Sequence, residues 1–77
     1  MAITFELTDT FCGEANYSWV QRGRIDLNEN ASELSIVKAA KAEAGLTNVR
    51  CRKENYGDTI ALYPYGLCMV LFINFEY

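Results

Sequence analysis

The chain has 77 residues, of which 51% are hydrophobic and 13% aromatic, and its seven basic and ten acidic residues give a net charge of −3. This apolar and aromatic content excludes intrinsic disorder, and the length leaves room for one domain. An acidic balance disfavours general binding to duplex nucleic acid, which rests mainly on neutralising phosphates. No histidine is present, so the commonest general base and transition-metal ligand is missing. We therefore expect a domain that is not an enzyme and that holds no cofactor and no metal.

The first third of the chain reads as two strands. Residues 2–8 alternate, with Ile3, Phe5 and Leu7 on one face, which is the pattern of a half-buried strand. Residues 9–14 form the connection, in which Gly13 is free to take a positive φ. A second strand begins at residue 15 or 16 and extends through Gly23 to residue 27, and Gly23 predicts a bulge or bend within it.

A helix follows the second strand. Asn30 and Glu33 have the spacing of a capping box, and Ser32 is an alternative cap. Gly45 is expected to end the helix in the left-handed conformation, with Leu46 folding back on the last turn. Helical spacing places these side chains on the buried stripe: Ile36, Val37, Ala40 and Ala44. Two lysines are expected outside it: Lys38 and Lys41.

Three further strands complete the pattern. They are expected from residue 49, over 59–63 and over 67–77, separated by turns at 55–58 and 64–66. The near-continuous apolar character of the last strand predicts an interior position in the sheet. The sum is a single α+β domain over residues 1–77, an antiparallel sheet of about five strands in the order β-β-α-β-β-β with one helix packed on it. Periodicity does not define the order of the strands in the sheet.

The three cysteines carry no recognisable chemistry. Cys12, Cys51 and Cys68 have no CxxC spacing and no histidine partner, so neither a zinc site nor an activated nucleophile is expected, and their role is that of small apolar side chains. Unpaired thiols in a chain without a signal-like start favour the cytoplasm, that of a host cell if the protein is phage-encoded. The longest apolar run, over 67–75, is too short to cross a membrane, which takes about 20 residues.

One candidate surface is acidic and aromatic. All the net charge lies in the first 40 residues, which hold six acids and three bases. Tyr17 and Trp19 lie beside Glu14, and both residue types are frequent anchors of protein interfaces. The simpler expectation for Trp19 is a place in the core, whereas Tyr17, Tyr56 and Tyr65 lie near turns. The partner-binding residues expected on this reading are Glu6, Asp9, Glu14, Tyr17, Asp26 and Glu29.

The alternative surface is basic. Arg22 and Arg24, and likewise Arg50 and Arg52, are spaced to share a strand face, with Lys53 next to the second pair. If the two strands were neighbours, the four guanidinium groups would form one patch able to hold phosphate. A small nucleic-acid-associated regulator is therefore the second reading. Dimerisation through a strand edge also stays open.

The segment from Leu7 to Val20, with Phe-Cys-Gly-Glu at its centre, resembles the start of short proteins from phages and other mobile elements. In size, acidity and α+β plan the chain also resembles the anti-CRISPR proteins, small phage-encoded inhibitors, many of which occupy the nucleic-acid-binding faces of Cas proteins. This resemblance implies a non-enzymatic inhibitor whose partner is a host protein, such as a CRISPR effector complex. Anti-CRISPR families share no common signature, so no functional residue is carried over.

Overall fold

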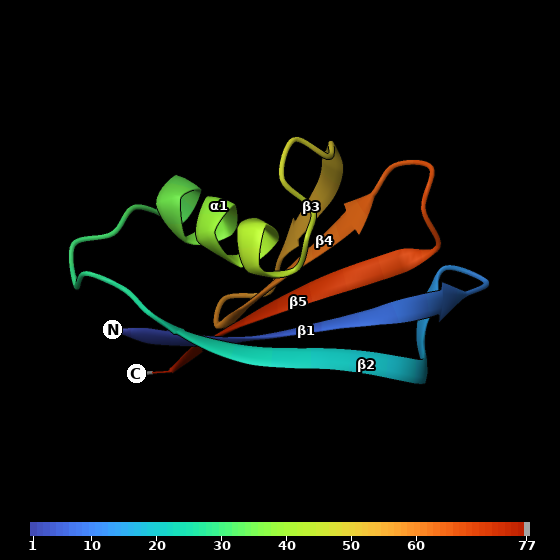
Figure 1. Ribbon diagram of the computed structural model, residues 1–77, viewed down its shortest axis with the longest axis horizontal. Helices are drawn as coiled ribbons and strands as arrows, with labels where there is room; N and C mark the ends of the chain where they lie inside the picture. Colours follow the sequence, from blue (N-terminus) through green and yellow to red (C-terminus); the bar gives the residue numbers. More distant parts are fainter. Residues whose placement is uncertain (77) are drawn as a thin grey trace.

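The computed structural model describes residues 1–76 as one sheet with one helix packed on it (Figure 1). The elements, in chain order, are β1 (Ala2–Phe11), β2 (Glu14–Asp26), α1 (Glu33–Glu43), β3 (Cys51–Asn55), β4 (Thr59–Pro64) and β5 (Met69–Glu76). The five strands pair antiparallel in the order β2-β1-β5-β4-β3. The expected α+β class and element order are confirmed, and the structure adds the strand order.

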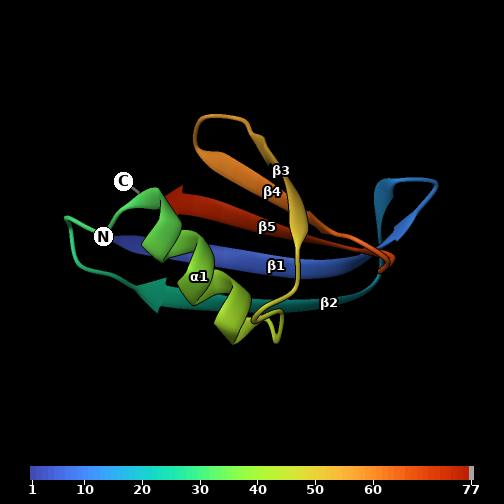
Figure 2. The same cartoon turned by 90° about the horizontal axis from the view of Figure 1, so that it is seen from above.

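One face of the sheet is covered by α1, and the other is open (Figures 1 and 2). Alternation along β1 turns Ile3, Phe5 and Leu7 toward the helix, where they are at most 5% exposed. They pack in one apolar cluster with residues of α1, of the segment that follows it, of β4 and of β5: Ile36, Ala40, Ala44, Leu46, Ile60, Leu62, Leu71 and Ile73. The small alanine side chains let the helix lie close to the sheet.

β5 lies in the middle of the sheet, between β1 and β4, as its apolar sequence predicts. Val70, Leu71 and Ile73 are fully buried, so the strand is covered on both faces over part of its length. It begins at Met69, two residues later than expected, because Leu67 belongs to the preceding turn and is exposed. The expected end of the strand at Tyr77 lies outside the described residues.

The ends of α1 explain its length. Ser32, the alternative cap, is the N-cap, and its hydroxyl accepts a hydrogen bond from the Ser35 backbone N–H. The capping box from Asn30 is therefore wrong, because the helix begins only at Glu33. At the other end Gly45 has φ 78°, and the N–H groups of residues 45 and 46 bond the carbonyls of Ala42 and Lys41. These two hydrogen bonds are those of a Schellman motif, and they confirm that Gly45 ends the helix as expected.

Two side chains of α1 differ from expectation. Val37 is only partly buried, at the edge of the core. Lys41 is half-buried, because its Nζ donates a hydrogen bond of 2.6 Å to the carbonyl of Val49. This bond ties the last turn of the helix to the segment that enters β3. β3 itself begins at Cys51, two residues after its expected start.

The β1–β2 hairpin has a shorter turn than expected. The bulge predicted at Gly23 does not form there. The strands run to Phe11 and from Glu14, and the two-residue turn between them, Cys12 and Gly13, has φ 55° and 81°, the positive values of a type I′ turn. Gly23 pairs in regular register with Phe5. A Cβ at this position would lie 2.5 Å from the Phe5 ring, so the glycine makes room for a core side chain instead of forming a bulge.

Candidate functional site

The bulge lies in the first part of β2. Thr8 pairs with Val20 and Thr10 with Ala15, so the four residues 16–19 of β2 stand opposite Asp9 alone. Such a bulge bends a strand and changes the direction of its side chains. Within it Tyr17 takes φ 56°, a left-handed conformation that non-glycine residues rarely adopt.

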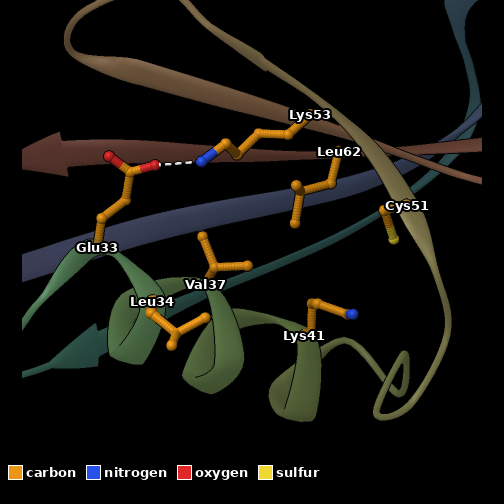
Figure 3. A pocket seen from close by; sticks show the side chains of 7 residues that line it. All are labelled: Glu33, Leu34, Val37, Lys41, Cys51, Lys53 and Leu62. Carbon is orange, nitrogen blue, oxygen red and sulfur yellow. Dashed lines mark hydrogen bonds and ion pairs between the residues drawn. The ribbon is translucent and has the colours of Figure 1, made fainter.

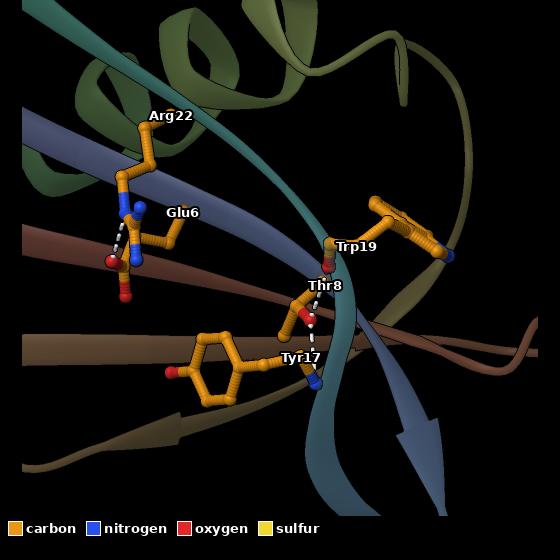
Figure 4. Close-up of polar contacts among 5 residues, drawn as sticks. All are labelled: Glu6, Thr8, Tyr17, Trp19 and Arg22. Carbon is orange, nitrogen blue, oxygen red and sulfur yellow. Dashed lines mark hydrogen bonds and ion pairs between the residues drawn. The ribbon is translucent and has the colours of Figure 1, made fainter.

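Thr8 and Asp9 hold this bulge in place. The buried hydroxyl of Thr8 donates to the carbonyl of Trp19 at 2.8 Å and accepts from the N–H of Tyr17 at 3.1 Å (Figure 4). The carboxylate of Asp9 accepts from the Ser18 hydroxyl, the Ser18 N–H and the side-chain amide of Asn16, at 2.6–3.0 Å. Backbone groups that lose their ladder partners in the bulge are thus bonded by side chains.

These bonds lower the pKa of Asp9 from 3.8 to about 2, chiefly through the Ser18 hydroxyl and the Asn16 amide, which donate to the charged form. Asp9 was expected to contact a partner. In the structure its carboxylate is occupied by the bulge, so its role in the fold is to position other side chains.

The bulge presents two aromatic rings to solvent. Tyr17 is 49% exposed and Trp19 43% exposed, so the simpler expectation of a core position for Trp19 is wrong. Figure 4 shows the Tyr17 ring on the side of β2 where Glu6 and Arg22 lie, and the Trp19 ring on the other side. Phe11 and Leu67 are also exposed near this end of the sheet, where Thr10 of β1 bonds Cys68.

The acids proposed as partner contacts do not form one patch. Glu6 accepts from Arg22 at 2.6 Å, and Asp26 lies 3.6 Å from Arg24. Glu14 and Glu29 are exposed and make no ion pair within residues 1–76, but Glu14 is the first residue of the long β2 strand and Glu29 lies beyond its other end. Of the six expected residues, Asp9, Glu14 and Tyr17 therefore share the bulged end, and the Asp9 carboxylate is bonded within the bulge itself.

The basic residues do not form one patch either. Arg22 and Arg24 are on β2 and Arg52 is on β3, the two opposite edges of the sheet, so the four-guanidinium patch does not form. Most of the basic groups are also paired with acids. Arg24 bonds Glu76 at 3.2 Å, Arg52 bonds Glu54, and Lys53 bonds Glu33 at 2.5 Å. Arg50 is exposed and precedes β3.

The open face of the sheet therefore carries no excess of positive charge. Its three arginines, at 22, 24 and 52, are matched there by four acids, at 6, 26, 54 and 76. The Arg52 guanidinium also lies 4.4 Å from the centre of the Tyr63 ring, within the range of a cation–π contact. This balance disfavours a phosphate-binding face.

A groove lies between α1 and β3 (Figure 3). Its volume is about 260 Å³, below the roughly 300–1,000 Å³ of most small-molecule sites. The Lys53–Glu33 ion pair crosses it, and burial raises the pKa of the Cys51 thiol on its wall, which makes that thiol a poor nucleophile. Cys51 alone has the expected role of an apolar side chain in the core, because Cys12 and Cys68 are exposed.

Residues 1–76 contain no cluster of three or more acid or cysteine side chains able to hold a metal ion. The one helix in that range, α1, is too short to cross a membrane. No family model, curated protein or solved structure matches the chain. Any inference about function therefore rests on the geometry of the surface around the bulged end of β2.

The sequence predicted Tyr17 as an exposed residue but missed the role of Thr8. The signal was present: a threonine and an aspartate end the regular alternation of β1, and Asn16 and Ser18 interrupt the aromatic run of β2. Short polar side chains of this kind often bond nearby backbone groups.

Proposed function

We propose that the protein is a small non-enzymatic inhibitor that binds another protein through the bulged end of β2. On the resemblance to anti-CRISPR proteins, the partner is a CRISPR effector complex, and inhibition is occlusion of its nucleic-acid-binding surface. The observation that supports this most directly is the hydrogen-bonded bulge, which places Tyr17 and Trp19 exposed on opposite sides of one strand.

Holding these rings in place has an energetic consequence for binding. Tyrosine and tryptophan bring large contact areas with few rotatable bonds, and they dominate the residues whose truncation weakens interfaces. The bonds from Thr8 and Asp9 fix the backbone beneath both rings before a partner arrives. Less ordering free energy is then lost on association.

Among the acids, this proposal uses only Glu14. Glu14 lies in the hairpin beside the bulge, and its charge is not neutralised within residues 1–76. A basic partner surface would be attracted to it during encounter, which raises the association rate more than the final affinity. Phosphate binding through arginines is not favoured, because these residues lie on opposite sheet edges and are mostly paired with acids.

The test is a titration of the protein against a purified CRISPR effector complex. Tyr17→Ala and Trp19→Ala should each weaken binding by about tenfold or more, as expected for interface anchors. Tyr56→Ala is the matched control, because Tyr56 is 59% exposed but lies in the turn between β3 and β4 at the other end of the sheet. Equal effects of all three substitutions, or no binding by the unmodified protein, would contradict the proposal.

A second pair of variants tests the charge contribution. Glu14→Lys should slow association, whereas Glu29→Lys, an equally unpaired acid beyond the other end of β2, should have little effect. Tight binding to an oligonucleotide that is lost on reversing Arg22 and Arg24 would instead favour the nucleic-acid reading.

A further inference from the structure

The outer strand has an edge whose unpaired backbone groups follow from the register. Met1 and Leu27 exchange both backbone hydrogen bonds, at 2.7 and 3.2 Å. In an antiparallel ladder such pairs alternate with pairs that exchange none. Register then makes Ile25, Gly23 and Gln21 the residues bonded to β1. The N–H and C=O groups that point away from β1 belong to Val20, Arg22, Arg24 and Asp26.

This row of residues is the free edge of β2. β2 is the last strand on its side of the sheet, and within residues 1–76 no strand pairs with its outer side (Figures 1 and 2). Edge strands are usually protected from pairing by shortness, by a bulge or by their charges. β3, at the opposite edge, is only five residues long. The bulge of β2 is confined to residues 16–19, so the rest of this edge depends on its charges.

The charges on the free edge are of both signs. Two arginines are followed by an aspartate, and all three side chains lie on the open face of the sheet. Arg22 is already bonded to Glu6 at 2.6 Å. Asp26 is the least committed of the three, because it is 78% exposed and its contact with Arg24, at 3.6 Å, is longer than a hydrogen bond. An arginine and an aspartate two residues apart on one edge are complementary to the same two residues of an antiparallel second copy.

The charges also select the register of such a pairing. A two-fold axis at Gly23 places Arg22 opposite Arg24 of the second copy. An axis at Arg24 places Arg22 opposite Asp26 but Arg24 opposite itself, and axes at Arg22 or Asp26 likewise oppose a charge to its own copy. An axis at Ile25 places Arg24 opposite Asp26 on both sides and opposes no like charges. Directly opposed unlike charges stabilise a ladder and like charges destabilise it, so the axis at Ile25 is favoured.

This register also suits the covered face of the sheet. Ile25 and Leu27 are only partly buried against the core. The axis at Ile25 would place this side chain against its own copy, and Leu27 opposite Gly23, which has no side chain to exclude it. The β1 ladder extends to Leu27, whereas the carbonyl of Asn28 is bonded within the turn that follows. The paired segment is therefore residues 23–27.

We infer that β2 pairs with β2 of a second copy of this chain, antiparallel and centred on Ile25, so that two sheets join into one. Main-chain bonds at Arg24 and Asp26 and the charge pairs between these residues would hold the copies together. So short an interface makes the dimer weak and dependent on concentration. The bulge lies outside the paired segment, so Tyr17 and Trp19 stay exposed at either end of the joined strands. The inference goes beyond the proposed function and does not depend on it.

The test is sedimentation equilibrium of the protein and of charge variants over a series of concentrations. The unmodified protein should reach the mass of a dimer. Arg24→Asp brings two carboxylates together on each side of the axis, and Asp26→Arg brings two guanidinium groups together, so each should weaken self-association about tenfold. An equimolar mixture of the two variants should recover it, and so should the double variant, because unlike charges then meet again on both sides of the axis.

Recovery makes the test independent of simple unfolding, because a variant that does not fold cannot be rescued by mixing. It also separates the registers: with the axis at Arg24, the double variant would oppose like charges at every position and stay monomeric. A monomer at every concentration, or a double variant that does not recover self-association, would overturn the inference. Tyr17→Ala and Trp19→Ala should leave the dimer unchanged, so its failure is distinguishable from failure of the aromatic-anchor proposal.

Discussion

Asp9 shows how a surface acid becomes a structural residue when donors converge on it. Its pKa is lowered to about 2 from an ordinary 3.8 by the hydroxyl and amide groups of Ser18 and Asn16. Because the folded-state value is the lower one, the charged carboxylate stabilises the fold above pH 3.8. That contribution decreases as the pH falls below 3.8 and is lost below about 2.

We therefore predict that Asp9→Asn lowers the melting temperature at neutral pH and removes part of the loss of stability between pH 4 and 2. The amide lacks the second acceptor oxygen and places a donor against Ser18 and Asn16. Thermal melts followed across this pH range measure both effects. Identical acid profiles for the two proteins would show that Asp9 does not hold the bulge through its charge.

Gly23 is a packing residue, and this gives a second prediction. Gly23→Ala places a methyl group 2.5 Å from the ring of Phe5, which is only 4% exposed and has little room to move. Overpacking of this kind costs about 1–3 kcal/mol of the free energy of unfolding. The measurement is a denaturant titration of Gly23→Ala, of Phe5→Leu and of the double variant.

In the Phe5→Leu background the alanine should cost clearly less, because the shorter side chain leaves space for the new methyl group. An equal cost in both backgrounds would mean that backbone entropy, and not contact with Phe5, explains the glycine.

At the scale of elements, the central position of β5 makes its inward residues the most costly to truncate. Leu71 is fully buried between β1 and β4, and Leu71→Ala should cost about 2–5 kcal/mol. Phe72 points to the open face and is only half-buried, so its truncation should cost less. Leu67→Ala in the adjacent turn is the control and should be near neutral.

Equilibrium unfolding in urea ranks the three variants. For a domain whose net stability is on the order of 3–5 kcal/mol, Leu71→Ala should be largely unfolded without denaturant. A Leu71→Ala protein that unfolds at the same urea concentration as Leu67→Ala would contradict the central role of this strand.

Elements whose signals are local were predictable from the sequence. The alternation of Ile3, Phe5 and Leu7 and the glycine after the helix are each settled by neighbouring residues. The interior position of β5 was also predictable, because an apolar run with few polar breaks is stable only where both faces are covered.

Features that depend on distant pairing were not predictable. The separation of Arg22 and Arg24 from Arg52 depends on strand order, which periodicity does not contain. Gly23 looked like a bulge because its partner, the Phe5 ring, lies across the ladder. Trp19 looked like a core residue because its size favours burial, yet the bulge moves it out of the regular alternation.

At the scale of the whole molecule, the fold divides its surface into unequal parts. α1 covers one face, ion pairs balance the other, and β3 ends the sheet with a short edge. β2 alone combines a long free edge with exposed aromatic side chains. A partner of this domain is therefore expected on the β2 side.

The most direct measurement is hydrogen–deuterium exchange of the whole protein, free and saturated with a CRISPR effector complex. We predict that exchange slows over β2, from Glu14 to Asp26, and stays unchanged in α1 and β3. Slowing confined to the groove between α1 and β3, or no slowing in any element, would contradict the claim that β2 is the binding surface.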